Sequence, residues 1–437
     1  MLITYLPILL LKVNLCYKNS LPSYSDYVIF YSVEGEISFV ASGTVTSPRG
    51  FRAGATYAGV KKKGKGVLDL GILLSEVPCV TEGLFTANRI KAAPVILSQQ
   101  RLPSGEVRAV VVNSGCANAV VGDTGLKDAA RMASLAAQNI GVSPETVLVA
   151  STGVIGRRLP MELIETGIRQ TTVSRDGGHK LARAIMTTDN VPKEAAVAVS
   201  VDWGEFIIGG IAKGSGMIHP NLATFLCFLT TDAAVGQDFL RLSLKKAVDV
   251  SFNMVSIDGD TSPNDMVLIM ANGLAGGKPI SPGSRRAEAF QQALNQLCIY
   301  LAKDIARDGE GASRLVEVTV SGAPSIAEAR LAAKTIVGSP LVKAAIHGSD
   351  PNWGRVIAAV GRSGVGVVES KISIYIGNIC LVKSGCPVAF DREGVIRLLC
   401  DSKVLINLEL NLGTATATAW GCDLSEEYVT INSEYTT

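Results

Sequence analysis

The stretch 213–233 reads KGSGMIHPNLATFLCFLTTDA, a glycine-rich loop followed by a strongly apolar run. Gly214 and Gly216 permit backbone angles that other residues resist, and Pro220 is typical of a turn. The run FLCFL at 225–229 is typical of a buried strand. The stretch therefore predicts a loop and a tight turn that lead directly into the core of a sheet.

Thr224 immediately precedes this run and directly follows Ala223. If the bond between these two residues is cut, Thr224 carries a hydroxyl group and a free α-amine on one residue. An α-amine titrates near pH ~8 in model compounds, so it can act as the general base for its own hydroxyl. A β-turn that enters a core strand is the commoner explanation of a lone Ala-Thr pair. The position alone leaves both a threonine nucleophile and a simple turn open.

Composition sets the broad class of the protein. The chain has 437 residues, enough for two or three domains or for one large α/β unit. With 47% hydrophobic and 18% charged residues, it is typical of a soluble globular protein with a sizeable core. The net charge is only +2, and the short basic run KKKGK at 61–65 is interpreted as a solvated hairpin tip. Composition therefore gives no support for binding to nucleic acid.

The cysteines and histidines indicate the compartment and argue against a metal site. The nine cysteines are scattered, with an odd count and no CxxC pair. This pattern argues against a disulfide framework and favours a reducing compartment, so we expect a cytoplasmic protein. The three histidines lie far apart in the sequence, and we therefore expect no structural zinc and no other bound metal.

Helical and strand patterns follow one another irregularly along the chain. Short strands recur around two main helical blocks without a simple βαβ order, so we expect an α+β fold with mixed or antiparallel sheets. Apolar spacing distinguishes the two kinds of element. The clearest predicted helices are 126–140, 161–170, 237–250 and 285–306, and the clearest predicted strands are 107–112, 147–150, 252–257, 266–270 and 404–410.

Two polar motifs follow predicted strands. STGVIG at 151–156 places a glycine turn after a strand, and such a turn can expose backbone N–H groups that stabilise an oxyanion. From these residues alone a simple turn is the commoner structure. DGDTSPND at 258–265 suggests a metal site or an aspartate nucleophile, but its spacing excludes an EF-hand. Because an apolar run resumes at Met266, we interpret this motif as a polar turn between two strands.

Five motifs together resemble one known family. They are STGVIG at 151–156, TTDN at 187–190, KGSGMIHPNLAT at 213–224, RDGEGA at 307–312 and the tail YVTINSEYTT at 428–437. In this order they resemble the ornithine acetyltransferase (glutamate N-acetyltransferase) family, the threonine-nucleophile enzymes of arginine biosynthesis. The resemblance runs from Thr44 to Thr437. The family usually has TTDT where this chain has TTDN, so Asn190 is a departure.

The resemblance implies a self-processing enzyme. It implies cleavage between Ala223 and Thr224, giving an alpha chain of residues 44–223 and a beta chain of residues 224–437, with two copies of each in a heterotetramer. Thr224 is then the catalytic nucleophile, and Thr152 and Gly153 form the oxyanion hole. The residues expected to bind substrate are Thr187 or its neighbour Thr188, Lys213, Thr224, Glu310, Asn432 and Thr437.

The activity that the resemblance implies is transfer of an acetyl group from N2-acetylornithine to glutamate through an ester on Thr224. The partners are then these small-molecule substrates and the two fragments of the chain itself, with no nucleic acid and no membrane. No cofactor is expected, and acetyl-CoA stays open as a second acetyl donor. Two alternatives are also open: a self-processing aminopeptidase or amidase of the same fold, in which water replaces glutamate, and a non-enzymatic binding protein.

Residues 1–43 precede the resemblance. The apolar run 2–11 is too short to span a bilayer and lacks the positively charged start of a signal peptide. The alternatives are a weak export signal, a poor organellar transit peptide, a disordered extension and a start codon assigned too early. Because the resemblance begins only near Thr44, we favour a disordered extension or a misassigned start.

Overall fold

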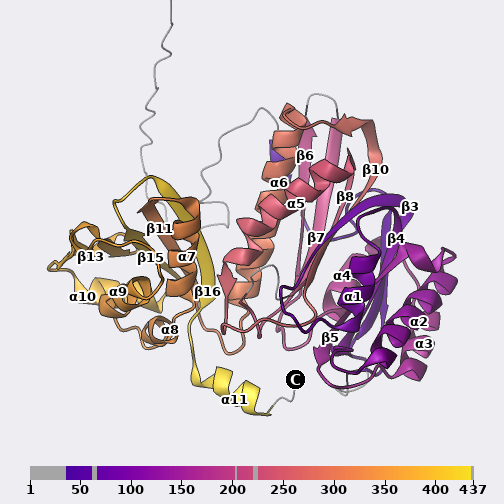
Figure 1. Cartoon of the computed structure of the whole chain (residues 1–437), viewed down its shortest axis with the longest axis horizontal. Coiled ribbons are helices and arrows are strands. Elements are labelled where there is room, and N and C mark those ends of the chain that lie inside the picture. Colours follow the sequence, from indigo (N-terminus) through magenta and orange to yellow (C-terminus); the bar gives the residue numbers. More distant parts are fainter. Residues whose placement is uncertain (1–35, 62–65, 202–203, 220–224, 435–437) are drawn as a thin grey trace, which may run out of the picture. The chain divides into compact units, whose positions relative to one another are not determined.

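The computed structural model describes residues 36–61, 66–201, 204–219 and 225–434 (Figure 1). The predicted cleavage site at Ala223 and Thr224 and the predicted substrate-binding residue Thr437 lie outside the described residues. The described residues form two β-sheets with helices packed on them, which confirms the predicted α+β class. None of the helices within the described ranges is long and apolar enough to cross a membrane.

The larger sheet brings the segments of the predicted site side by side. Over the described residues it has nine strands in the order β1-β6-β7-β8-β10-β3-β4-β5, with β2 paired to β3. β7 and β8 are antiparallel, whereas β8 and β10 are parallel, as are β4 and β5. The strands are β1 (Glu36–Phe39), β2 (Phe51–Thr56), β3 (Leu70–Phe85), β4 (Ser104–Cys116), β5 (Val147–Val154), β6 (Lys193–Val201), β7 (Gly204–Lys213), β8 (Leu226–Val235) and β10 (Met266–Ile280).

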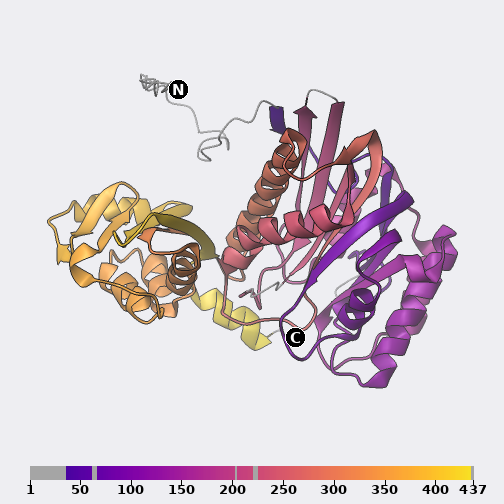
Figure 2. The same cartoon turned by 45° about the horizontal axis from the view of Figure 1, so that its top comes forward.

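Helices cover both faces of this sheet (Figures 1 and 2). Successive residues of a strand point to opposite faces. Leu229 of β8 accordingly packs in one core with Leu297 of α6, whereas its neighbour Phe228 packs in a second core with Leu181 of α4. The helices of this part are α1 (Ala93–Gln100), α2 (Asp123–Ile140), α3 (Met161–Gln170), α4 (Gly178–Ala184), α5 (Gln237–Asp249) and α6 (Arg285–Arg307).

The smaller sheet is built from the last part of the chain. Within the described residues it has seven strands in the order β14-β13-β12-β15-β11-β16-β9. α7 packs on β11 and β16, and α6 contacts both β6 of the larger sheet and β16 of the smaller one. The elements are β9 (Val255–Ser256), β11 (Leu315–Ala323), β12 (Ser373–Ile376), β13 (Ile379–Lys383), β14 (Cys386–Pro387), β15 (Lys403–Glu409), β16 (Ala415–Cys422), α7 (Ile326–Val337), α8 (Pro340–His347), α9 (Trp353–Gly361), α10 (Arg392–Cys400) and α11 (Glu426–Glu434).

The long predicted helices are confirmed, but the predicted strand 252–257 is wrong. Helix 161–170 coincides with α3, and the other three overlap α2, α5 and α6. In the segment 252–257 only β9 pairs with another strand, after a 3-10 turn at Phe252–Met254. Phe252 is buried, and its ring centroid lies 4.3 Å from that of Phe225. The apolar pattern of this segment therefore reflects packing beside the central stretch, not strand pairing.

Two further segments differ from the sequence prediction. Residues 36–39 belong to the predicted N-terminal extension, yet they form β1 and pair with β6, so the ordered fold begins before Thr44. The predicted solvated tip at 61–65 is described only at its first residue. Lys61 is buried, and its Nζ donates a hydrogen bond to the Leu68 carbonyl oxygen at 2.9 Å.

Candidate active site

One pocket collects the predicted site residues from segments that are far apart in the sequence. Thr152 and Gly153 lie at the end of β5, Lys213 ends β7, and Phe225 immediately precedes β8. Ile155 follows β5 and Leu226 begins β8, and the other lining residues come from the loops after α4 and β7, the turn before β10, the loop after α6, and α11. Every predicted site residue that the structure describes lines this pocket: Thr152, Gly153, Thr187, Lys213, Glu310 and Asn432.

The turn at the end of β5 requires glycine at position 153. Gly153 has φ +122°, in a region that favours glycine. A Cβ atom on Gly153 would lie 2.5 Å from the carbonyl carbon of Gly115 in the neighbouring strand β4. The two strands therefore approach too closely for a side chain here, and the β4–β5 register is irregular at the same point. The oxyanion role of Thr152 and Gly153 stays a prediction.

Asn264 connects this turn to the segment before β10. Its side-chain Nδ2 donates to the carbonyl oxygens of Ala117 at 2.6 Å and of Ser151 at 2.9 Å. The Ser151 hydroxyl in turn donates to Asn113 Oδ1 at 2.6 Å. Because these bonds are buried, breaking one would leave an unsatisfied polar group in the core. They fix the ends of β4 and β5 next to Thr152.

The Glu310 carboxylate packs directly on the glycine loop after β7. Glu310 is only 7% exposed, and its backbone N–H donates to the Ser215 carbonyl oxygen at 2.8 Å. A Cβ atom on Gly216 would lie 2.4 Å from Glu310 Oε2, so any side chain at this position would displace the carboxylate. Lys213, which precedes this loop, is also buried and lines the same pocket. The loop therefore brings a lysine and a glutamate side chain into one buried site.

The C-terminal helix α11 reaches the same carboxylate. Asn432 donates its side-chain Nδ2 to Glu310 Oε2 at 2.8 Å. Just before α11, the Ser425 hydroxyl donates to the Gly311 carbonyl oxygen at 2.6 Å, which anchors the start of the tail beside Glu310. The tail therefore lines the pocket through Asn432, and the substrate-binding roles of Asn432 and Thr437 stay predictions.

Thr187 and Thr188, which the sequence left as alternatives, both line the pocket. The Thr188 hydroxyl lies within hydrogen-bond distance of the Ser215 hydroxyl, at 2.7 Å. The Thr187 backbone N–H donates to Asp189 Oδ2 at 3.0 Å. The loop after α4 is thus bonded to the glycine loop through Thr188, and it is held in its own shape by the buried carboxylate of Asp189.

Sequence reasoning missed Asp265, a buried carboxyl group in the pocket lining. Asp265 Oδ2 has no hydrogen-bond partner among the described residues, and burial raises the pKa of this carboxyl well above its usual value. The parallel pairing of β8 with β10 places it there, and the sequence does not show that pairing. Met266 is opposite Leu226, so Asp265 and Phe225, which directly precede these two residues, lie at the same end of the paired strands. Both segments begin with polar residues followed by an apolar run.

The motif DGDTSPND is a polar turn, as the sequence interpretation has it. The Asp258 carboxylate accepts hydrogen bonds from the backbone N–H groups of Met217 and Ile218, the latter at 2.8 Å. Met217 has φ +57°, an unusual angle for this residue, and the bond to Asp258 holds it there. Among the described residues, no group of three or more His, Cys, Asp and Glu side chains could hold a metal ion.

The pocket of this α+β fold combines a lysine, two carboxyl groups and a glycine turn, which are groups that can bind a small charged molecule. The sequence matches the ArgJ family over residues 52–437. A relative, the arginine biosynthesis bifunctional protein ArgJ of Dehalococcoides mccartyi (strain CBDB1), is 49% identical over 405 residues, which are 93% of this chain and 100% of the relative. This chain belongs to the ArgJ family.

Two solved structures are also similar. The arginine biosynthesis bifunctional protein ArgJ of Bacillus halodurans is 46% identical, with 48% of this chain and 98% of that chain covered and a TM-score of 0.47. The ornithine acetyltransferase of Mycobacterium tuberculosis, complexed with ornithine, is 39% identical, with 43% and 100% covered and a TM-score of 0.39.

Membership of the family confirms the resemblance of the five motifs. The chain is a member of this family of arginine biosynthesis enzymes. The aminopeptidase or amidase and the non-enzymatic binding protein, which the sequence left open, are therefore not supported.

Proposed function

We propose that this enzyme transfers the acetyl group of N2-acetylornithine to the α-amine of glutamate, through an ester on Thr224. One observation carries the proposal: residues from the ends of β5 and β7 and from three loops line a single pocket that Phe225, the neighbour of Thr224, also lines. A nucleophile at position 224 would therefore be next in the chain to a residue of the same pocket.

The first half-reaction forms the ester. The Thr224 hydroxyl oxygen attacks the acetyl carbonyl carbon, and the free α-amine of the processed Thr224 takes the hydroxyl proton. The negative charge that develops on the carbonyl oxygen is stabilised by Thr152 and Gly153, and one such donor is typically worth about 3 kcal/mol. The C–N bond then breaks, and ornithine leaves with a proton returned from the Thr224 amine.

The second half-reaction transfers the acetyl group to the acceptor. The uncharged α-amine of glutamate attacks the ester carbonyl carbon, the C–O bond breaks, and Thr224 recovers its hydroxyl proton. Donor and acceptor both carry an α-carboxylate, but only N2-acetylornithine carries a side-chain ammonium, because the side chain of glutamate ends in a second carboxylate. We assign Lys213 to the substrate carboxylate and Glu310 to a substrate ammonium, since opposite charges attract strongly in a buried site. Acetyl-CoA is a possible second donor for the same ester.

Cleavage between Ala223 and Thr224 would leave the two fragments within one sheet. β8 belongs to the second fragment but lies between β7 of the first fragment and β10, and β10 pairs with β3 of the first. The strands of the two fragments are thus interleaved, so we expect the fragments to stay together after cleavage and to form the heterotetramer. All cysteines within the described residues are free, which supports a cytoplasmic enzyme.

Mass spectrometry and a rate assay test the proposal together. The purified protein should give two fragments, whose masses place the cut between Ala223 and Thr224, and Thr224→Ala should give one uncut chain. Incubation with N-acetylornithine alone should add one acetyl group to the second fragment. Later addition of glutamate should remove that group and produce N-acetylglutamate. An uncut active enzyme, or release of free acetate at the same rate with and without glutamate, would contradict the proposal.

A further inference from the structure

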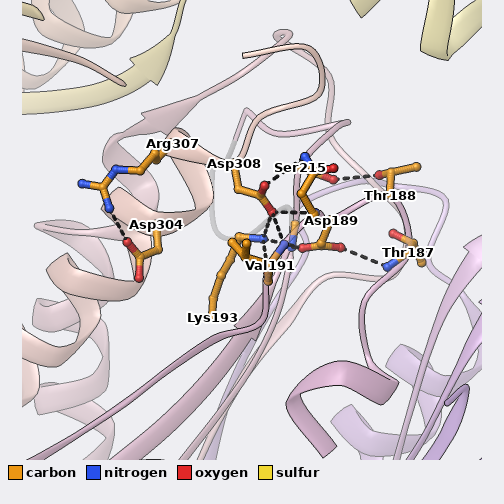
Figure 3. A network of polar contacts seen from close by, with 11 residues as sticks. Thr187, Thr188, Asp189, Val191, Lys193, Ser215, Asp304, Arg307 and Asp308 are labelled. Atoms are coloured by element: carbon orange, nitrogen blue, oxygen red, sulfur yellow. Dashed lines mark hydrogen bonds and ion pairs between the residues drawn. The ribbon is translucent and has the colours of Figure 1, made fainter. Parts of the chain in front are cut away.

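Behind the pocket lies a buried ion triad of Lys193, Asp189 and Asp308 (Figure 3). Lys193 Nζ is 2.7 Å from Asp189 Oδ1 and 2.6 Å from Asp308 Oδ2. The side chains of Lys193 and Asp189 are fully buried, and that of Asp308 is 7% exposed. None of the three lines the pocket. Such a group costs free energy to bury, so its presence calls for a physical explanation.

Lys193 and Asp189 keep their charges in spite of burial. Burial alone would raise the pKa of Asp189, but Lys193 and Lys213 outweigh that effect and hold this pKa well below its usual range. Burial alone would lower the pKa of Lys193, and the two carboxylates raise it instead. The triad is therefore a cation between two anions, held together by attraction in a site from which water is excluded.

Each carboxylate of the triad binds backbone N–H groups of segments that reach the pocket. Asp189 accepts from Thr187, at 3.0 Å, and from Gly214, the residue after Lys213, at 2.7 Å. Asp308 Oδ2 accepts from Asn190, at 3.0 Å, which orders the end of the loop after α4.

Asn190 adds a side-chain bond to the same carboxylate. Its Nδ2 donates to Asp308 Oδ1 at 3.1 Å. Asn190, which stands where the family usually has the last threonine of TTDT, therefore bonds directly to a member of the triad. Asp308 itself stands two residues before Glu310 in the loop after α6.

The hydrogen bonds close a ring through three pocket segments, which we define as 187–188, 213–216 and 308–310. Asp189 joins the first segment to the second, and Asp308 brings the third against Lys193. The ring is completed inside the pocket, because the Glu310 N–H donates to the Ser215 carbonyl oxygen at 2.8 Å. Moving any one segment would therefore strain or break a bond in another.

We propose that the ion triad is a positioning device for acetyl transfer, in which Lys193 sets the spacing of the three pocket segments without touching substrate. The inference rests on the proposed function, because it assigns substrate contacts to those segments. Loss of the cation leaves two buried carboxylates with like charge, which repel each other and push the segments apart. Because the three segments would hold the substrate before and during the reaction, their displacement should weaken substrate binding and raise KM.

The test compares Lys193→Met with a matched disruption elsewhere. Glu317→Gln weakens another ion network, in which Lys303 Nζ is 3.1 Å and Lys403 Nζ is 3.4 Å from Glu317 Oε2, and Glu317 lies in the smaller sheet outside the pocket lining. Both variants should lower the urea midpoint of unfolding. Only Lys193→Met should raise KM for N-acetylornithine, by about tenfold or more, with a smaller change in kcat. A structural role alone would reduce the folded fraction and leave KM unchanged.

Two further variants keep the test decisive if Lys193→Met does not fold. Asp308→Asn retains the Lys193–Asp189 pair and should still raise KM, by about three- to tenfold. The double variant Lys193→Met/Asp308→Asn removes the like-charge repulsion and should have a lower KM than Lys193→Met where both fold. A KM within about twofold of wild type in Asp308→Asn and in any folded Lys193→Met preparation would overturn the proposal. If the wild-type enzyme itself transfers no acetyl group, the proposed function fails first, and the two failures are thereby distinguished.

Discussion

Replacing Asn432 with alanine should weaken acetyl transfer through Glu310. The change removes the Nδ2 group that donates to Glu310 Oε2 at 2.8 Å. Hydrogen bonds to charged groups typically contribute about 1.5–3 kcal/mol. Asn432 lies on an exposed part of α11, where water competes for the carboxylate, so we take about 1–2 kcal/mol. That free energy corresponds to a fall in kcat/KM of about 5- to 30-fold.

The assay measures initial rates against N-acetylornithine at saturating glutamate. Two matched variants on the same helix control for its stability and charge. Ser433→Ala should be silent, because the Ser433 hydroxyl donates to the Thr430 carbonyl oxygen of its own helix, at 2.9 Å, and Ser433 does not line the pocket. Asn432→Asp should be worse than Asn432→Ala, since it places a second carboxylate against Glu310.

A double-mutant cycle with Glu310→Gln isolates the pair. If the two side chains act together, adding Asn432→Ala to Glu310→Gln should cost clearly less than adding it to the wild-type chain. Equal costs in both backgrounds, or a kcat/KM of Asn432→Ala within about twofold of wild type, would refute the reasoning. The tail would then pack near the site without supporting it.

Three other changes test the glycine loop after β7, the buried carboxyl group of Asp265, and His219, which lies in the stretch 213–233. Gly216→Ala puts a Cβ 2.4 Å from Glu310 Oε2, so kinetics should show a fall in kcat/KM of about 10²-fold while circular dichroism shows a folded protein. Burial raises the pKa of Asp265 in the folded state. The native state therefore becomes less stable as pH rises above about 4, the pKa of this carboxyl in the unfolded chain. Asp265→Asn should increase the free energy of unfolding, measured in urea, more at about pH 7 than at about pH 4. Burial and Lys334 lower the pKa of His219 to about 4 in the folded state. The native state should therefore lose stability as pH falls below about 6.5, the pKa of an unfolded histidine, by at most about 3 kcal/mol. Urea unfolding of His219→Asn should show a smaller loss over the same pH range.

The sequence was most informative where a single segment contains both the pattern that determines its local structure and the polar residues that line the site. Glycines 153 and 216 both belong to polar motifs in the sequence: Gly153 is required by a backbone approach of 2.5 Å, and Gly216 leaves room for the Glu310 carboxylate, which an added Cβ would approach to 2.4 Å. The long helices could be predicted for the same reason, since apolar spacing within one helix encodes its buried face. Local pattern and local structure agree in these segments.

The residues that sequence reasoning missed depend on contacts between distant segments. Asp265 belongs to the pocket because β10 runs parallel to β8, a pairing that neither strand encodes by itself. Lys193 begins an ordinary strand, and its partner Asp308 follows 115 residues later. The strand predicted at 252–257 failed for a related reason, because Phe252 is apolar in order to pack on Phe225 and not to pair in a sheet.

The two buried acidic sites differ in the charge of the protein group that bonds to the carboxylate, and this difference leaves one of them able to bind a cationic ligand. Asp189 and Asp308 share the cation Lys193, the charge of Lys213 also acts on Asp189, and both carboxylates accept hydrogen bonds from backbone N–H groups, so protein groups already occupy them. Glu310 instead accepts a hydrogen bond from the neutral amide of Asn432. A neutral donor orders the carboxylate without cancelling its charge, and that charge is what an incoming ammonium group would bind. Had a lysine stood at position 432, the same geometry would have given a closed ion pair and a weaker site for ornithine.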